Sequence, residues 1–263
     1  MKKNLRFIWL LVKYKFSRMM MYRADFFFVF FCDGALFLVQ LLAFEAIYSQ
    51  VDSIGGWGRG EMIVFVGTFS LINGLNMLVY FFGIVGIPGK IRRGDLDQYL
   101  TKPVNPLLRL TFENADLGSF PLLILSALII AYGVNVSGIA VTPARAFGYA
   151  ALVIIMTVLW YDMELIIRTI PFFVMSADGI MEVEGQLLEL NFKVPGILYK
   201  GAFKFVFYFL LPYGIMSTVP TQVIAGSVSA PGAVTAALTA AAFTAFALRF
   251  WKRGLKNYES AGG

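Results

Sequence analysis

The chain of 263 residues contains no histidine and a single cysteine, Cys32. Histidine and cysteine are the usual protein ligands of zinc, so their near absence argues against a metal site. A lone cysteine has no partner within the chain and says nothing about the redox compartment. The chain also lacks a Gly-x-Ser-x-Gly turn and paired carboxylates in a convincing arrangement for acid–base chemistry. We therefore expect no catalytic residue, no metal ligand and no enzyme activity in this chain.

The phosphate-binding loop of nucleotide hydrolases is missing as well. That motif needs a glycine, four residues, then Gly-Lys and Ser or Thr, and the nearest sequence, Gly89-Lys90-Ile91, fails at both ends. We expect no cofactor to be bound by the chain itself. The net charge is +6, but the basic residues flank apolar runs instead of forming one patch, so no nucleic-acid partner is expected.

Charged residues make up only 14% of the chain and hydrophobic residues 59%, including 26 phenylalanines, and the mean hydropathy is +0.73. This composition is typical of an integral membrane protein. A membrane-spanning helix needs about 20 apolar residues, so the chain has room for roughly six and for no sizeable soluble domain. The sequence predicts an all-α membrane protein in which residues 24–263 form one domain of six transmembrane helices, at about residues 24–48, 61–85, 117–134, 144–168, 201–219 and 232–250.

Residues 1–23 carry seven basic residues and no acidic residue around a short apolar stretch. Charge resumes directly after that stretch and no small-residue cleavage site follows, so a cleaved signal peptide does not fit. We expect residues 1–23 to form an uncleaved amphipathic helix that lies in the cytoplasmic interface of the membrane.

Few polar side chains fall inside the predicted spans. Asp33 lies about 12 Å along the first span, where a carboxylate either lines a substrate path or pairs structurally, and both interpretations stay open. Asn73 and Asn76 share one side of the second span, and we prefer hydrogen bonding between helices as their role. Pro212 predicts a kink in the fifth span. The residues that a translocation path would use are Asp33, Gln40, Asn73, Asn76 and Pro212.

The second half of the chain is harder to divide into spans. Glu164 and Arg168 have the i, i+4 spacing of an ion pair at the end of a long fourth span. We expect the acidic residues 178–190 to form a second cytoplasmic surface segment, and the apolar residues 220–231 to dip back into the outer leaflet. The sixth span carries a stripe of alanines that permits close helix contact, namely Ala233, Ala237, Ala241 and Ala245.

The longest water-facing internal segment is residues 87–109, which we call the polar island. It lies between two apolar runs, and its charges of both signs alternate with apolar residues. This pattern predicts a short amphipathic helix at the membrane surface, closed by Pro103. The island is either a solvated loop whose charges set the topology or a docking segment for a partner. Its central charges are Lys90, Arg92, Arg93, Asp95 and Asp97.

Basic residues are distributed unevenly in this topology. With both termini in the cytoplasm, the cytoplasmic side holds twenty Lys and Arg residues, and the outer loops hold only Arg59 and Arg145. This bias follows the positive-inside rule. The polar island is therefore expected to face the cytoplasm.

The island also contains a motif with fixed spacing, Arg93-Gly94-Asp95-Leu96-Asp97 followed by Leu100, Pro103, Asn105, Pro106 and Leu107. It resembles the cytoplasmic signature of ABC-2 family transporter permeases, the six-span membrane subunits of ATP-driven exporters. Val194 departs from that family's pattern, in which an aromatic residue is expected before the proline. A weaker likeness to the family's fifth span and following outer segment is carried by Pro195, Tyr199, Pro212, Pro220 and Gly226.

The resemblance implies partners and a mechanism. A second permease subunit, identical or a sibling, would pair with this chain in the cytoplasmic membrane of a bacterium or archaeon, and two ABC ATPase subunits holding ATP and Mg²⁺ would bind beneath. Spans one, two and five would line a path for amphipathic or hydrophobic cargo, and the aromatic residues would otherwise contact lipid. A coupling helix at residues 91–100 would transmit ATPase closure, with Ile91, Leu96 and Tyr99 as anchors. The implied coupling residues are Ile91, Arg92, Arg93, Gly94, Asp95, Leu96, Asp97, Tyr99, Leu100, Pro103 and Pro106.

Two other functional classes fit the same sequence. An ion- or proton-coupled secondary transporter would use the intramembrane carboxylates Asp33, Asp162 and Glu164, although the two halves of the chain show no convincing inverted repeat. A non-transporting assembly subunit would need the polar island to bind something other than an ATPase.

Overall fold

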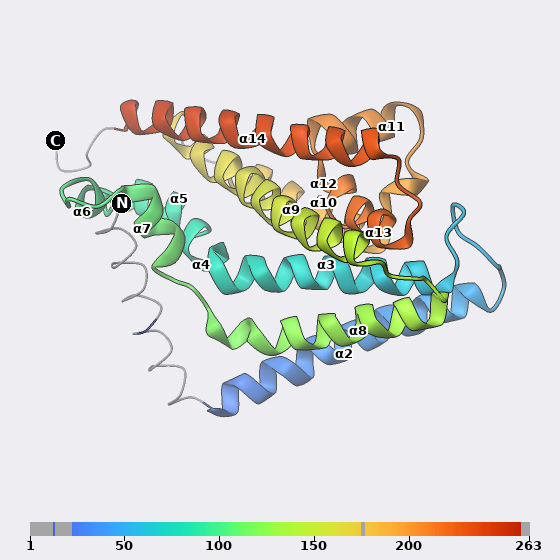
Figure 1. Ribbon diagram of the computed structural model, residues 1–263. Coiled ribbons are helices and arrows are strands. Elements are labelled where there is room, and N and C mark those ends of the chain that lie inside the picture. The colour runs from blue at the N-terminus through green and yellow to red at the C-terminus, as the bar shows by residue number, and fades with distance from the viewer. Residues whose placement is uncertain (1–12, 14–22, 175–176, 259–263) are drawn as a thin grey trace.

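The computed structural model describes residues 13, 23–174 and 177–258. These residues form helices and no β-strand. Figure 1 shows the long helices lying side by side in one bundle, with the short helices gathered at its two ends. The expected N-terminal interfacial helix, residues 1–23, falls almost entirely outside the described residues. The long helices are α2 (Arg23–Tyr48), α3 (Arg59–Val79), α8 (Phe120–Ser137), α9 (Pro143–Thr169) and α14 (Ala230–Lys256).

Four helical stretches are long and apolar enough to cross a membrane: Arg59–Val79, Leu117–Ser137, Pro143–Phe172 and Pro231–Lys256. A bent pair, Gly201–Leu210 with Tyr213–Ala225, would make a fifth if it were one span. The described side chains of α2 include a shorter apolar stretch, Gly34–Tyr48. The protein is therefore a multi-pass, all-helical membrane protein. The predicted first, second, third, fourth and sixth spans each overlap a long helix, although α3 ends at Val79, before the predicted end of the second span at residue 85.

Small residues bring α3 and α8 unusually close together. A Cβ atom at Gly133 would lie 2.8 Å from the backbone nitrogen of Val64, and a Cβ at Gly60 would lie 2.6 Å from the Cα of Ser137. Only glycine fits at such distances, and membrane helices use small residues in this way to pack their backbones. The hydroxyls of Ser70 and Ser126 are hydrogen-bonded across the same contact, 2.6 Å apart.

Helix α9 lies at the centre of the main apolar cluster, which combines residues of α3, α9, the bent pair and α14. It begins at Pro143, behind the Thr142 side chain, which accepts a hydrogen bond from the Arg145 backbone N–H at 3.3 Å. Helix α14 contacts α9 through Ala236, Ala240 and Ala247, which are buried. Of the alanine stripe predicted from the sequence, Ala233 packs against the main apolar cluster, but Ala241 is exposed, and the buried alanines form a stripe beside the predicted one.

The two ends of the bundle are defined by contacts. We call one the loop end, where the loops at residues 49–58 and 138–142 lie next to each other because the ends of α3 and α8 meet there. We call the other the island end, where residues of the polar island share an apolar cluster with Phe172 and Trp251. Phe172 belongs to η2 (Ile170–Phe172), the short helix that follows α9.

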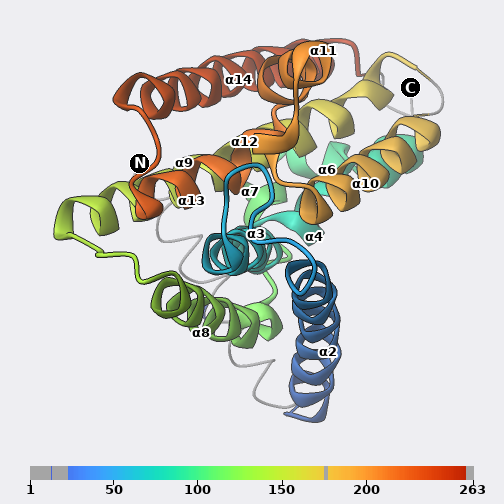
Figure 2. The ribbon, with the colours of Figure 1, turned by 90° about the vertical axis from the view of Figure 1, so that its right-hand side faces the viewer.

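The predicted fifth span is a re-entrant hairpin. At its start, Leu198 and Ile197 approach Gly55 of the loop end, and at its finish, Gly226 packs against the guanidinium of Arg145, also at the loop end. Because both ends of residues 196–226 lie at the same end of the bundle, the segment enters and returns, and the expectation of a crossing at residues 201–219 is wrong. Its elements, seen from the loop end in Figure 2, are η3 (Gly196–Leu198), α11 (Gly201–Phe205), the π-helical η4 (Val206–Leu210), α12 (Tyr213–Met216) and α13 (Thr218–Ala225).

Helix α10 (Asp178–Lys193) runs from the island end, after η2, toward the loop end, where η3 begins. Leu188 and Phe192 pack against the main apolar cluster, and Phe192 touches the rings of Phe37 and Phe69. The interpretation of residues 178–190 as a surface segment is therefore wrong for this face of the helix. The loop end therefore also holds Lys193, Lys200 and Lys204. Seventeen Lys and Arg residues then lie on the island side and five on the loop side, so basic residues still predominate on the island side.

Candidate functional site

The polar island is built from short helices instead of one amphipathic helix. Gly94 has φ 74°, a left-handed conformation that ends the first helix after Arg93. The expectation of one continuous coupling helix at residues 91–100 is therefore wrong, since one helix ends at Arg93 and the next begins at Asp97. Asn105 starts the last helix by accepting hydrogen bonds from the backbone N–H groups of Leu107 and Leu108 at 2.9 and 3.3 Å. The helices of the island are α5 (Ile87–Arg93), α6 (Asp97–Leu100) and α7 (Pro106–Phe112), and α4 (Phe81–Ile84) directly precedes them.

The apolar side of the island faces its own chain. Leu96 is 0% exposed and Tyr99 is 8% exposed, and both pack with residues of α7, α9 and α14. Ile91 lies at the margin of the same cluster. Leu96 and Tyr99 therefore fix the island to the bundle and do not offer a partner the anchors expected from the sequence.

A charged network fastens the same side. The Tyr99 hydroxyl lies 2.8 Å from both carboxylate oxygens of Glu113, and Lys90 forms an ion pair with Glu113 at 3.0 Å. The guanidinium of Arg109 lies 4.3 Å from the centroid of the Tyr99 ring, and it donates a hydrogen bond to the carbonyl of Gln98 at 3.3 Å. Burial, followed by the hydrogen bond to Glu113, raises the pKa of the Tyr99 hydroxyl above its ordinary value, so this hydroxyl remains a donor at physiological pH.

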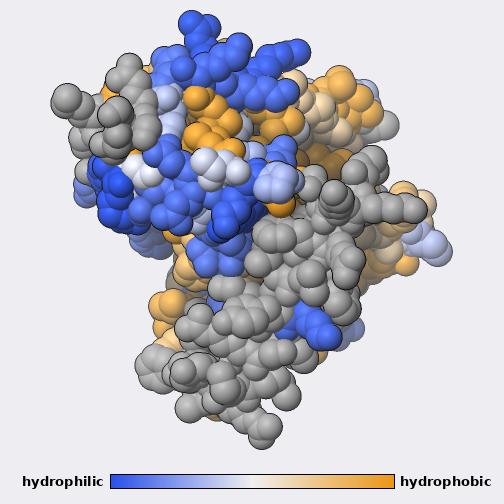
Figure 3. Space-filling view, turned by 90° about the vertical axis from the view of Figure 1, so that its left-hand side faces the viewer, coloured by the Kyte–Doolittle hydropathy of each residue, from blue (hydrophilic) through white to orange (hydrophobic). Residues whose placement is uncertain are grey.

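The opposite side of the island faces outward. Figure 3 looks at the island end and shows hydrophilic residues gathered over its upper part, with apolar atoms between them. Leu100 is 40% exposed, and Arg93 and Asp95 form an ion pair at 2.8 Å across the Gly94 turn. The exposed residues of this outward face are Arg92, Arg93, Gln98, Leu100, Thr101, Lys102, Pro103 and Asn105.

A second feature is a cavity of about 330 Å³ between α2, α3, α9 and α10. Its walls are mostly aromatic and aliphatic, and its polar groups are Asn73, Asn76 and Glu189. Such a mixture of apolar walls and a few polar groups is typical of small-molecule pockets. The apolar and aromatic lining residues are Leu36, Phe37, Phe69, Met77, Phe81, Leu122, Trp160, Leu188 and Phe192.

Asn76 is the unusual residue of this cavity. It is 0% exposed, and neither its amide nitrogen nor its amide oxygen has a hydrogen-bond partner among the described residues. The expectation that it bonds to another helix is therefore wrong for this conformation. A buried amide without a partner carries a desolvation cost of about 1–3 kcal/mol, which a ligand that hydrogen-bonds to it would remove.

The other residues expected along a path are placed differently. Gln40 on α2 is half-buried and does not line the cavity. Pro212 is buried at the tip of the re-entrant hairpin, directly before α12. Asp33 belongs to α2, and its side chain lies outside the described residues. The structure thus brings Asn73 and Asn76 together and leaves Gln40 and Pro212 elsewhere.

Buried charges join three elements near the island end. The predicted pair of Glu164 and Arg168 is confirmed, at 2.9 Å, and Arg168 also pairs with Glu184 of α10. Tyr213, at the tip of the re-entrant hairpin, lies near Glu184 and interacts with it electrostatically. The i, i+4 spacing revealed the first pair, but no sequence signal assigned Glu184 to it. Asp162, two residues before Glu164 on α9, accepts a hydrogen bond from Thr244 of α14 at 2.5 Å.

Comparison with known protein families gives one result that covers most of the chain. A family model described as an ABC-2 family transporter protein matches residues 35–262. No curated protein and no solved structure matches the chain. The matched region contains the polar island, the cavity residues and every long helix, with α2 included from residue 35. The chain therefore belongs to the ABC-2 family of membrane transporter proteins.

Proposed function

We propose that the chain is the permease subunit of an ATP-driven exporter, and that it pairs with a second permease subunit and two ABC ATPase subunits. ATP and Mg²⁺ bind in the ATPase subunits, and this chain supplies the membrane path. The observation that carries the proposal is the arrangement of the polar island. Its apolar side packs within the chain through Leu96 and Tyr99, and its outward face is exposed, where a partner can contact it.

The topology we propose has six crossings, with α10 as the fifth. Helices α2, α3, α8, α9, α10 and α14 alternate between the two ends, and the re-entrant hairpin enters from the loop end. Both termini then lie on the side of the polar island, which we assign to the cytoplasm because the basic residues are concentrated there. The membrane is the cytoplasmic membrane of a bacterium or archaeon.

Coupling to the ATPase runs through the outward face of the island. Leu100 supplies an apolar contact at the centre, and Arg92, Arg93 and Lys102 supply charges around it. Because Leu96 and Tyr99 tie the island to α7, α9 and α14, a push on this face moves those helices as well. ATPase closure is thereby converted into a rigid-body change in the membrane region.

The cargo path runs along the cavity between α2, α3 and α10. Its aromatic walls suit an apolar body, and the unpartnered amide of Asn76 suits one neutral hydrogen-bonding group. We infer that the cargo is an amphipathic or hydrophobic molecule. The exposed apolar residues Leu36 and Val39 of α2 give the second permease subunit a surface to cover next to this path.

Co-purification of the tagged chain from its own cells in mild detergent tests the proposal. We expect a stoichiometric partner with a phosphate-binding loop and ATPase activity. Leu100→Ala and Lys102→Glu should each weaken association with that partner by about tenfold. Leu128→Ala is the matched control, because Leu128 is 62% exposed on α8, away from the island, and this variant should associate normally.

The opposite result would identify a different class. A chain that purifies alone, shows no ATPase partner and still moves solute in liposomes is a secondary transporter. Of the carboxylates which that mechanism would use, Asp162 is hydrogen-bonded to Thr244 and Glu164 is paired with Arg168. These contacts favour a structural role for both groups.

A further inference from the structure

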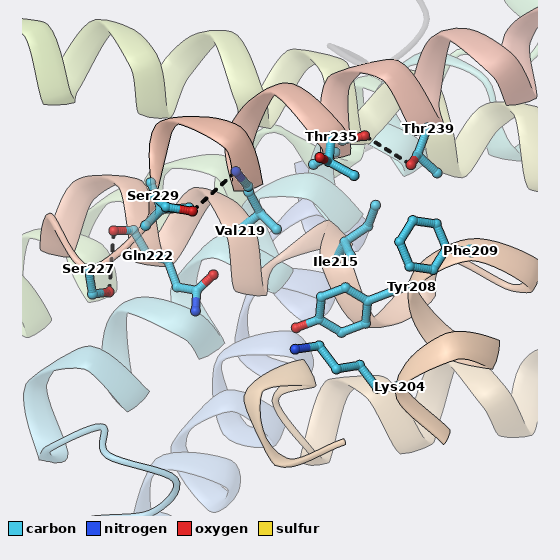
Figure 4. Close-up of a pocket in the computed structure, with 13 residues that line it drawn as sticks. Lys204, Tyr208, Phe209, Ile215, Val219, Gln222, Ser227, Ser229, Thr235 and Thr239 are labelled. Atoms are coloured by element: carbon cyan, nitrogen blue, oxygen red, sulfur yellow. Dashed lines mark hydrogen bonds between the residues drawn. The ribbon is translucent and has the colours of Figure 1, made fainter. Parts of the chain in front are cut away.

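A separate pocket lies between the re-entrant hairpin and α14. It has a volume of about 380 Å³, which is within the range of small-ligand sites, roughly 300–1,000 Å³. Figure 4 shows its lining side chains converging from α11, η4, α12, α13 and the start of α14. None of them belongs to the cavity that contains Asn76. The pocket is therefore a site separate from that cavity.

The only charged side chain in its lining is Lys204. Its ammonium group lies 5.5 Å from the centroid of the Tyr208 ring and forms no ion pair with an acidic residue among the described part of the chain. A cation at the edge of a membrane is stabilised by an anionic group that approaches it. The pocket is consequently suited to an anion.

The neutral polar groups of the pocket add selectivity. The hydroxyls of Thr235 and Thr239 donate to the carbonyls of Pro231 and Thr235, at 2.8 and 2.9 Å. Their lone pairs therefore remain as acceptors for hydroxyl groups of a ligand. The side chain of Gln222 points into the pocket in Figure 4, and its amide can donate to an anion. The pocket also adjoins the N-terminus of α14, whose helix dipole favours negative charge.

The η4 side of the pocket is apolar. Phe209, which lines the pocket, is 49% exposed, and the next residue, Leu210, is 61% exposed. A soluble anion gains nothing from such a border, whereas acyl chains can lie along it. The polar pocket and its apolar border together have the two-part chemistry of a phospholipid.

We propose that this pocket binds the headgroup of an anionic phospholipid that carries free hydroxyls, such as a phosphatidylglycerol. Lys204 pairs with the phosphate, Gln222 donates to it, and Thr235 and Thr239 accept from the headgroup hydroxyls. The acyl chains run over the exposed apolar side chains of η4. The site is distinct from the proposed cargo path and does not depend on it.

The test measures lipid retention by the purified full-length chain in nanodiscs of phosphatidylcholine that contain a small fraction of phosphatidylglycerol. Lys204→Gln should weaken retention of phosphatidylglycerol by about fivefold. Lys200→Gln is the matched control, because Lys200 is exposed, lies four residues away and does not line the pocket, and it should change retention less than twofold. Equal losses in both variants, or no loss in Lys204→Gln, would overturn the proposal.

Two further arms identify the ligand. Thr235→Val should reduce retention of phosphatidylglycerol and leave that of phosphatidic acid unchanged, because only the former has headgroup hydroxyls. Soluble glycerol phosphate and inorganic phosphate should not displace the lipid at millimolar concentration. Displacement by either would show a site for a soluble anion and would refute the lipid assignment.

Discussion

The buried charges of α9 and α10 predict that loss of Arg168 destabilises the protein far more than loss of Glu184. The side chain of Arg168 is 7% exposed, and those of Glu164 and Glu184 are 2% exposed. One cation is therefore shared between two carboxylates inside the bundle. Removing one partner of a buried ion pair costs about 3–5 kcal/mol, because an uncompensated charge is left behind. Arg168→Met leaves two such charges and should lower the free energy of unfolding by at least this amount.

The matched variant is Glu184→Gln, which removes one negative charge and leaves the pair of Arg168 and Glu164 intact. It should cost about 1 kcal/mol or less, the value of one ordinary hydrogen bond. The measurement is the free energy of unfolding in mixed micelles, titrated with a denaturing detergent. Equal losses in Arg168→Met and Glu184→Gln would refute the reasoning. A triple variant with Glu164→Gln added to both should recover most of the loss, because none of the three charges of this cluster then remains.

Three other variants test packing and the cavity. Leu96→Ala should cost about 2–5 kcal/mol of stability, whereas Leu100→Ala should cost about 0.5 kcal/mol or less, measured by the same titration. Gly133→Leu should abolish the monodisperse folded protein in size-exclusion chromatography, because its Cβ would lie 2.8 Å from the backbone nitrogen of Val64. Asn76→Leu should keep or raise stability but reduce transport of the cargo, since the amide has no hydrogen-bond partner within the described chain. A loss of stability would show instead that Asn76 forms a hydrogen bond to another helix.

The long helices were predictable because their sequences are apolar over most of their length. The sequence placed α9 within one residue at each end, including its pair of Glu164 and Arg168. Helix α10 could not be found in this way, because Glu182, Glu184 and Glu189 make it look like a surface segment. Its burial depends on Arg168, which lies on another helix, and a pattern within one segment does not report such a partner.

For the polar island, too, the sequence predicted only part of the structure. Its amphipathic pattern predicted helical structure and an apolar side, but it did not say what covers that side. The structure covers Leu96 and Tyr99 with the chain's own α7, α9 and α14, so the island's outward face consists of other residues. The sequence motif contains Gly94, but it does not report the positive φ of this residue, which breaks the helix. That conformation depends on how the two halves of the island pack.

The pairing of Glu184 with Arg168 also has a consequence for how the chain enters the membrane during synthesis. A segment of 16 residues with several carboxylates is a poor substrate for insertion on its own, since each acidic group near the bilayer centre costs about 2.5–3.5 kcal/mol. The cation that neutralises Glu184 is carried by the preceding helix, which leaves the ribosome first. Partition of α10 into lipid should therefore wait for α9, and the two helices should leave the translocation channel as a pair.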